Sequence, residues 1–282
     1  MTGDALADEV PLYPFFGDER TLVFAHDYAA GSLQSRHRHD VPQLLHAARG
    51  VMRVTTPGGY WVIPPNRGIW IPAFMPHEIR MVGPVSMRTL YVEAASAPAE
   101  AGECAVVVVP PLLQRLLEEL SAYDPRLPTR GVPRHRAMEE LVLIEAAGLE
   151  HLPLSVRMPR DSRLLKLCGA LLEQPGDTST ADELADRIGA STRTLRRLFQ
   201  EEVGMSFAAW RQQVRLMEAL ARLAEGQAIA RVSRELGYAA PSAFVAMFRR
   251  AMGCSPSRFA KGLPVRGAPG RRVAPEASRG RT

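Results

Sequence analysis

The fold of the second half is decided by residues 180–202, TADELADRIGASTRTLRRLFQEE, and by a similar stretch at residues 228–252, AIARVSRELGYAAPSAFVAMFRRAM. Each stretch predicts a short helix that ends at Gly189 or Gly237, then a turn and a second helix. Glycine favours such helix ends because it adopts the left-handed conformation without steric cost. This layout is typical of a helix-turn-helix, whose second helix enters the major groove of DNA.

The polar side chains that these helices leave exposed are the candidate DNA contacts. In each unit the apolar residues fall on one face, so the two helices can pack together. Thr180 and Glu183 form a capping box that fixes where the first unit begins. A small bundle with solvated arginines would explain one unit, but two units in register favour DNA binding. The candidates are Ser191, Thr192, Arg193, Arg196 and Arg197 in the first unit and Ser242, Val245, Ala246, Arg249 and Arg250 in the second.

The spacing of the units and the charge of the chain agree with this interpretation. Residues 206–225 predict one helix of about 30 Å, close to the roughly 34 Å between successive major grooves on one face of DNA. Residues 160–282 carry 21 Lys and Arg against 12 Asp and Glu; subtraction from the totals of 35 and 30 leaves 14 against 18 for residues 1–159. Such asymmetry is expected when only one half meets a polyanion.

Residues 160–260 resemble the DNA-binding domain of the AraC/XylS family of bacterial transcription regulators. Where the family often has an acidic residue, two positions before Ser242, this chain has Ala240. We therefore expect the second unit to make fewer base contacts, with Arg249 and Arg250 as backbone anchors. The matching positions are residues 184–185 and 189–199 in the first unit, and Ile229, residues 236–238, 242–244 and 248–250, Gly253 and residues 255–256 in the second.

The first half contains short β-type runs at residues 51–55, 60–63, 68–71 and 87–92, which predict an antiparallel barrel. Two segments resemble cupin motifs, with Gln43 at the usual Glu position of the first motif and His77 at the histidine of the second. The expected fold class is therefore α+β, with a cupin-like antiparallel β-barrel followed by an all-α domain with two helix-turn-helix units. The first-motif positions are Gly31, His37, His39, Gln43 and Gly50.

The resemblance implies that His37, His39, Gln43 and His77 form an effector site, and two uses of the histidines are open. Three converging imidazoles are a metal-ligand set, so His37, His39 and His77 would suit Zn, Ni or Fe. A neutral Gln43 weakens such a site, and the histidines can instead serve as hydrogen-bond partners of an organic effector. We expect Arg36, Arg38 and His46 to be ordinary solvated strand residues.

The remaining segments predict a connector and two ends. Helices at residues 112–120 and 137–147 carry apolar stripes, which can pack onto the barrel or pair two subunits. The sequence predicts neither a signal peptide nor a membrane span, and three scattered cysteines are typical of a reduced, cytoplasmic protein. The expected domains are an N-terminal segment at 1–20, a sensor barrel at 21–95, a helical connector at 96–158, a DNA-binding domain at 159–261 and a basic disordered tail at 262–282.

Together these features predict a transcription regulator and not an enzyme. Its expected partners are double-stranded DNA, a small-molecule effector and RNA polymerase, with a homodimer left open. Residues 43–45, 64–72 and 90–91 resemble AraC regulators with an N-terminal cupin domain that control drug-efflux transporter genes, which implies an adjacent transporter or efflux gene as target. The alternative is a metal-dependent cupin enzyme with a helical assembly domain; metal content and salt-dependent duplex binding would discriminate the two.

Overall fold

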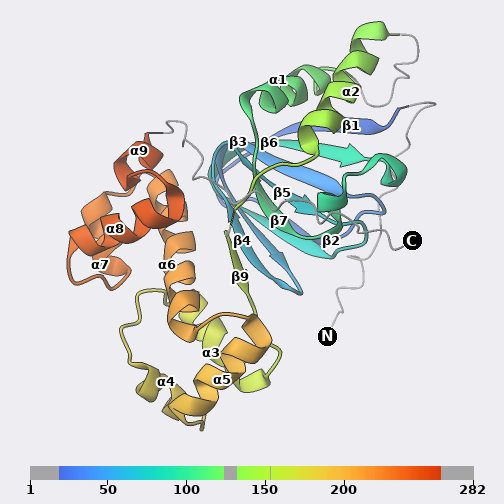
Figure 1. Cartoon of the computed structure of the whole chain (residues 1–282). Helices are drawn as coiled ribbons and strands as arrows, with labels where there is room; N and C mark the ends of the chain where they lie inside the picture. The colour runs from blue at the N-terminus through green and yellow to red at the C-terminus, as the bar shows by residue number, and fades with distance from the viewer. Residues whose placement is uncertain (1–18, 124–131, 153, 262–282) are drawn as a thin grey trace, which may run out of the picture.

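The chain folds into a sheet-rich first half and a helical second half (Figure 1). The computed structural model describes residues 19–123, 132–152 and 154–261. The predicted tail at 262–282 and most of the predicted N-terminal segment lie outside these residues. The expected α+β class is confirmed.

Nine strands form one antiparallel sheet within the described residues. They follow the order β1-β6-β3-β5-β7-β8, with β2 beside β6 and with β4 beside both β3 and β9. In the described part of the chain, β1 and β8 at the two ends of this order do not pair with each other. The predicted barrel is therefore an unclosed sheet. The strands are β1 (Thr21–Tyr28), β2 (Leu33–His37), β3 (Gln43–Thr56), β4 (Gly59–Ile63), β5 (Arg67–Ile71), β6 (His77–Val92), β7 (Ala105–Val108), β8 (His151–Leu152) and β9 (Ser155–Arg157).

The two longest strands, β3 and β6, bend and thereby give the sheet its curvature. The first part of β3 pairs with β5 and its last part with β4, while β6 pairs along both parts. The register shifts around Gly50, whose φ is +78° and whose Cβ, if present, would lie 2.3 Å from the Pro84 carbonyl oxygen. Only glycine fits this bulge, which turns the strands without ending them.

The region predicted as a helical connector also contributes strands. β7, β8 and β9 all lie between residues 96 and 158 and join the same sheet, so the sheet extends beyond the predicted boundary at residue 95. β8 and β9 are too short for a periodic pattern, which is why the sequence did not predict them. Two 3-10 turns, Ala94–Ser96 and Ala99–Gly102, precede β7.

Helices α1 (Pro111–Leu120) and α2 (Pro133–Ala146) pack onto the sheet (Figure 1). The predicted stripe of α1 is buried in one cluster with Trp70 and Leu90, which favours packing onto the sheet as its role. α2 begins at Pro133, four residues earlier than predicted, because proline is favoured in the first turn. The buried Glu139 carboxylate accepts hydrogen bonds from the Arg20 and Thr21 backbone N–H groups at 3.0 Å, and this ties α2 to the start of β1.

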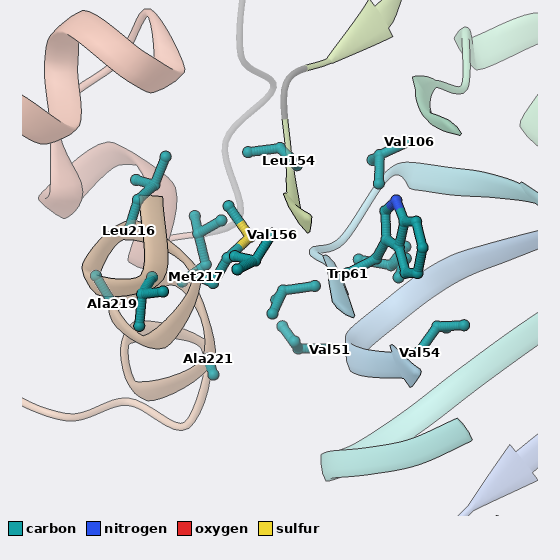
Figure 2. Close-up of a cluster of buried hydrophobic side chains, with 14 of the residues drawn as sticks. Val51, Val54, Trp61, Val106, Leu154, Val156, Leu216, Met217, Ala219 and Ala221 are labelled. Atoms are coloured by element: carbon teal, nitrogen blue, oxygen red, sulfur yellow. The ribbon is translucent and has the colours of Figure 1, made fainter. Parts of the chain in front are cut away.

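The second half consists of helices packed around α6, and it shares its core with the sheet. Figure 2 shows Leu216 and Met217 of α6 facing Leu154 and Val156, which precede and enter β9. All four side chains are at least nine-tenths buried, so the two halves form one continuous hydrophobic core. The helices are α3 (Ser162–Glu173), α4 (Ala181–Arg187), α5 (Thr192–Val203), α6 (Phe207–Ala224), α7 (Ile229–Glu235), α8 (Pro241–Met252) and α9 (Pro256–Ala260).

Candidate functional site

The first helix-turn-helix unit, α4 and α5, is fixed by its own side chains. The predicted capping box is present: Thr180 Oγ1 accepts from the Glu183 N–H, and the Glu183 carboxylate accepts from the Thr180 N–H at 2.7 Å. Gly189 has a φ of +64°, and the Ser191 hydroxyl accepts from the Thr194 N–H at 3.1 Å. Both helix starts therefore have the side-chain cap that the sequence predicts.

Two arginines dominate the exposed face of α5. Arg193 and Arg196 are exposed and form no ion pair with any residue that the structure describes. Arg197 is also exposed but forms an ion pair within its own helix at 2.6 Å. The hydroxyl of Ser191 caps α5, and that of Thr192 donates to a carboxylate of α4. Of these five side chains, only Arg193 and Arg196 have no ion-pair or hydrogen-bond partner among the described residues.

The second unit, α7 and α8, lacks side-chain caps. Ala228 and Ala240 occupy the N-cap positions and offer no acceptor, while Pro241 takes the first helical position. Gly237 has a φ of +74°, so the glycine-terminated helix end is confirmed here as well. Phe244 and its neighbours on the inner face of α8 are fully buried.

The exposed face of α8 is less polar than that of α5. Ser242, Ala246, Arg249 and Arg250 are exposed, and Val245 is half-buried. Recognition helices contact bases mainly through their N-terminal residues, whereas the two arginines lie in the last turn of α8. None of the ten predicted DNA-contacting residues is buried.

Helix α6 separates the two units. Its 18 residues span about 27 Å, and Figure 1 shows α4 and α5 at one end and α7 and α8 at the other. The predicted helix over residues 206–225 is confirmed, with Ser206 as its N-cap and Glu225 as its C-cap.

In the sheet, the three predicted histidines come together. Ligand nitrogens of His37, His39 and His77 all lie within 4.8 Å of one another. The rings of His37 and His77 have centroids 4.3 Å apart, and Tyr91 packs edge-on against His39 with its centroid at 5.1 Å. His39 and His77 are buried.

Gln43 joins this cluster through a hydrogen bond that fixes a tautomer. Nδ1 of His77 donates to the Met75 carbonyl at 2.9 Å, so a neutral His77 has its lone pair on Nε2. The Gln43 amide N–H donates to that Nε2 at 2.8 Å. The glutamine therefore occupies the lone pair that a metal ion would need.

His39 and His77 stay uncharged at neutral pH. Burial lowers the pKa of His39 to about 3, with a further contribution from His37, and burial lowers the pKa of His77 to about 4. Neutral imidazoles suit metal ligation and hydrogen bonding equally. Three nitrogens bound to one ion at 2.0–2.1 Å would be about 3.3 Å apart, closer than the 4.8 Å limit observed here. With Gln43 on His77, the present arrangement fits a hydrogen-bonding site better than a metal centre.

A cavity of about 950 Å³ opens next to this cluster and reaches the helical half. Met75, whose carbonyl holds His77, lines it together with Trp61. It is also lined by residues 157–160, which lead from β9 towards α3, and by Glu201 and Glu202 at the end of α5. The buried Trp61 indole N–H has no hydrogen-bond partner within the described residues.

Known proteins resemble the helical half most specifically. Residues 184–262 match a helix-turn-helix domain family. The arabinose operon regulatory protein of Escherichia coli is 28% identical over 44% of this chain and 42% of its own length. Residues 184–262 are therefore a helix-turn-helix domain similar to those of AraC-type transcription regulators.

Similarity to one AraC-family regulator extends into the sensor half. The transcriptional regulator NimR of Escherichia coli is 26% identical over 79% of this chain and 81% of its own length. The other curated relatives are matched over 31% to 44% of their length. A crystal structure of fatty-acid-bound ToxT from Vibrio cholerae aligns with 89% of this chain and 98% of that one, at 10% identity and a TM-score of 0.37. Because all the curated relatives are named as regulators, the chain is a regulator and not the cupin enzyme considered above.

Ion pairs connect the β-sheet to the second helix-turn-helix unit. Arg53 of β3 contacts Glu218 of α6 at 2.6 Å, and Glu218 also contacts Arg222 at 2.8 Å. Arg222 in turn contacts Glu235, the last residue of α7, at 2.6 Å. We call these four residues the charge relay. It runs from the sheet through α6 to the second helix-turn-helix.

Separate hydrogen bonds connect α5 and α6 to residues 157–161, which follow the sheet. The Glu202 carboxylate at the end of α5 accepts from the backbone N–H groups of Arg160 and Asp161, at 2.6 and 2.9 Å. The Trp210 indole N–H donates to the Arg157 carbonyl at 2.8 Å. Sequence reasoning missed these residues and the charge relay, because Glu202, Trp210 and Arg53 have partners 41 to 165 residues away and no local pattern marks those contacts. In the described residues, no helix is long and apolar enough to span a membrane.

Proposed function

We propose that this AraC-family regulator senses a small organic molecule at the histidine cluster and the adjoining cavity. The carrying observation is that one cavity touches both Met75, beside His77, and Glu202, at the end of the first reading helix. A volume of about 950 Å³ is within the range of small-molecule pockets. The effector would offer a hydrogen-bond acceptor to the Trp61 N–H and an apolar body to Met75 and Pro72.

Coupling follows if the effector binds two arrangements of the halves with different affinity. A ligand that binds both arrangements equally shifts neither. The wall formed by residues 157–160 is also the backbone that Glu202 and Trp210 hold, so a ligand against it acts on these hydrogen bonds. We therefore propose that the effector changes how α5 is presented to DNA.

The proposed DNA contacts are the ten positions named above in the two helix-turn-helix units, none of which is buried, with Arg193 and Arg196 as base readers. The proposed target is an adjacent transporter or efflux gene, on the strength of the resemblance at residues 43–45, 64–72 and 90–91. Contact with RNA polymerase remains a prediction. A homodimer also remains a prediction. A second subunit would pack on the exposed apolar side chains of Leu112, Leu141 and Ile144 on α1 and α2.

A divalent metal is the second candidate ligand, favoured by the convergence of three imidazoles. It is tested by the Gln43→Glu substitution, which replaces an amide donor with a carboxylate ligand. If the wild-type site binds organic ligands only, protein purified without chelator holds little Zn, Ni or Fe, and the substitution raises the bound metal. One equivalent of metal in the wild type would establish the metal candidate instead.

The proposed function is tested by deleting the gene and measuring transcripts with and without candidate effectors. We expect neighbouring transporter transcripts to lose their effector response in the deletion strain, and the full chain to bind their promoter duplex with strong salt dependence. Unchanged transcripts and no duplex binding at low salt would contradict the proposal. Duplex binding without any effector response would contradict the proposed sensing role and leave the proposed regulatory role standing.

A further inference from the structure

The loop between α3 and α4, residues 175–179, contacts all three parts of the DNA-binding half. Its Asp177 carboxylate pairs with Arg187, the last residue of α4, at 3.0 Å. The Ser179 hydroxyl accepts from the same guanidinium at 2.6 Å. This loop is therefore attached to the first helix-turn-helix by two side chains.

The same loop is attached to the central helix by its backbone carbonyls. Arg215 of α6 donates to the Pro175 carbonyl at 3.1 Å and to the Asp177 carbonyl at 2.8 Å. Arg211 donates to the Asp177 and Ser179 carbonyls. Arg215 also lies over the Tyr238 ring of the second unit, 5.5 Å from its centroid. One guanidinium thus contacts the loop and the second unit at once.

Two glycines let the loop touch the second unit directly. A Cβ on Gly176 would lie 2.0 Å from the carbonyl oxygen of Glu235, at the end of α7. A Cβ on Gly237, in the following turn, would lie 2.7 Å from the Gly176 carbonyl oxygen. Both obstacles are backbone atoms, so any side chain at either position must push the turn of the second unit away from the loop.

We propose that Gly176, Gly237 and Arg215 form a clamp that fixes the angle between the two helix-turn-helix units and thereby sets the half-site spacing that the protein accepts. α6 packs against both units, and its Arg222 pairs with Glu235 of the second unit. The clamp adds a second attachment near the turn of each unit. These are positioning residues, since none of them lies on the exposed face of a reading helix.

The test uses the full chain and a duplex that the wild type selects from a random-sequence pool. Derivatives of this duplex carry one or two base pairs added to or removed from the segment between the half-sites, and two more have one half scrambled. For Gly176→Ala and Gly237→Ala we expect affinity for the original duplex to fall about tenfold to a hundredfold, as when base contacts are lost. Affinity for each single-half duplex stays at the wild-type level, and the preference among spacings moves or disappears.

Matched variants separate this role from general damage. Gly169→Ala on α3 is the control, because a Cβ there meets no atom within 4 Å; it should leave spacing preference unchanged. Arg215→Gln removes two hydrogen bonds without a steric clash and should widen the accepted spacings. Wild-type spacing preference in all three clamp variants, or an equal loss on single-half and full duplexes, would overturn the clamp. The inference rests on the proposed DNA contacts of both units; a wild type that selects no two-half duplex would instead overturn that proposal.

Discussion

The sheet-rich half and the DNA-binding half keep their polar groups in opposite places. All seven histidines lie before residue 160, and His39, His46, His77 and His135 are buried in the sheet-rich half. In the described part of the DNA-binding half, Ser233 alone is a buried polar residue, while the arginines of the reading helices are exposed. The first arrangement suits an uncharged ligand recognised away from water, and the second suits a polyanion.

The largest expected effect is a loss of folding stability at acidic pH, caused by protonation of a buried histidine. Burial lowers the pKa of His46 from 6.5 to about 4, so the folded state disfavours its protonation. Its contribution to stability is therefore complete above pH 6.5 and is lost as the pH falls towards 4, by up to about 3 kcal/mol. Urea unfolding of the full chain between pH 7 and 4.5 measures this loss. His46→Gln should flatten the pH dependence, and the exposed His26→Gln should not; equal slopes in the two variants would contradict the assignment.

Removing the exposed arginines should affect DNA binding and leave stability unchanged. We expect Arg193→Ala or Arg196→Ala to weaken binding to the selected duplex by about 1–3 kcal/mol and to relax preference at particular base pairs. Arg115→Ala on α1 is the matched control, since its guanidinium is exposed, pairs with Glu118 in its own helix and lies outside the DNA-binding half. Fluorescence anisotropy on specific and random duplexes measures both the affinity and the sequence preference. A uniform loss on all duplexes would make these side chains phosphate anchors instead.

The charge relay connects the two halves and should make a smaller contribution to the free energy of unfolding. The side chains of Arg53 and Glu218 are 29% and 18% exposed, so solvent partly screens their attraction. A double-mutant cycle with Arg53→Gln and Glu218→Gln should give a coupling of about 1 kcal/mol in urea unfolding. Additive effects of the two substitutions would show that the pair does not hold the halves together.

The smallest expected effects are changes in folding stability when the N-cap residues of the two units are substituted. Ala240 caps α8 without an acceptor, so Ala240→Asp should stabilise the protein by about 0.5–1 kcal/mol. Thr180→Ala, at the start of the already capped α4, should destabilise it by a similar amount. Thermal unfolding of the full chain compares them, and a destabilising Ala240→Asp would contradict this account of α8.

Local patterns account for what the sequence predicted. The capping box at Thr180, the end of α6 and the glycine ends of α4 and α7 depend on neighbours within a few residues. The histidine cluster could be predicted because the motif resemblance brought together positions on different strands. The burial of His46, expected to be solvated, could not, because its alternation is broken by the bend of β3 and its partner is the Arg67 carbonyl on β5. The contact of Gly176 with Glu235 joins residues 59 positions apart and leaves no local signal.

The most direct test of sensing by the buried histidines is a reporter assay on the promoter beside the gene. It compares the wild type with His39→Ala and His77→Ala at matched protein levels across candidate effectors, with His26→Ala as the exposed control. The account predicts that both cluster variants lose the inducer response while their affinity for the selected duplex stays at the wild-type level. A full inducer response in both variants would contradict it and leave the sheet as a scaffold.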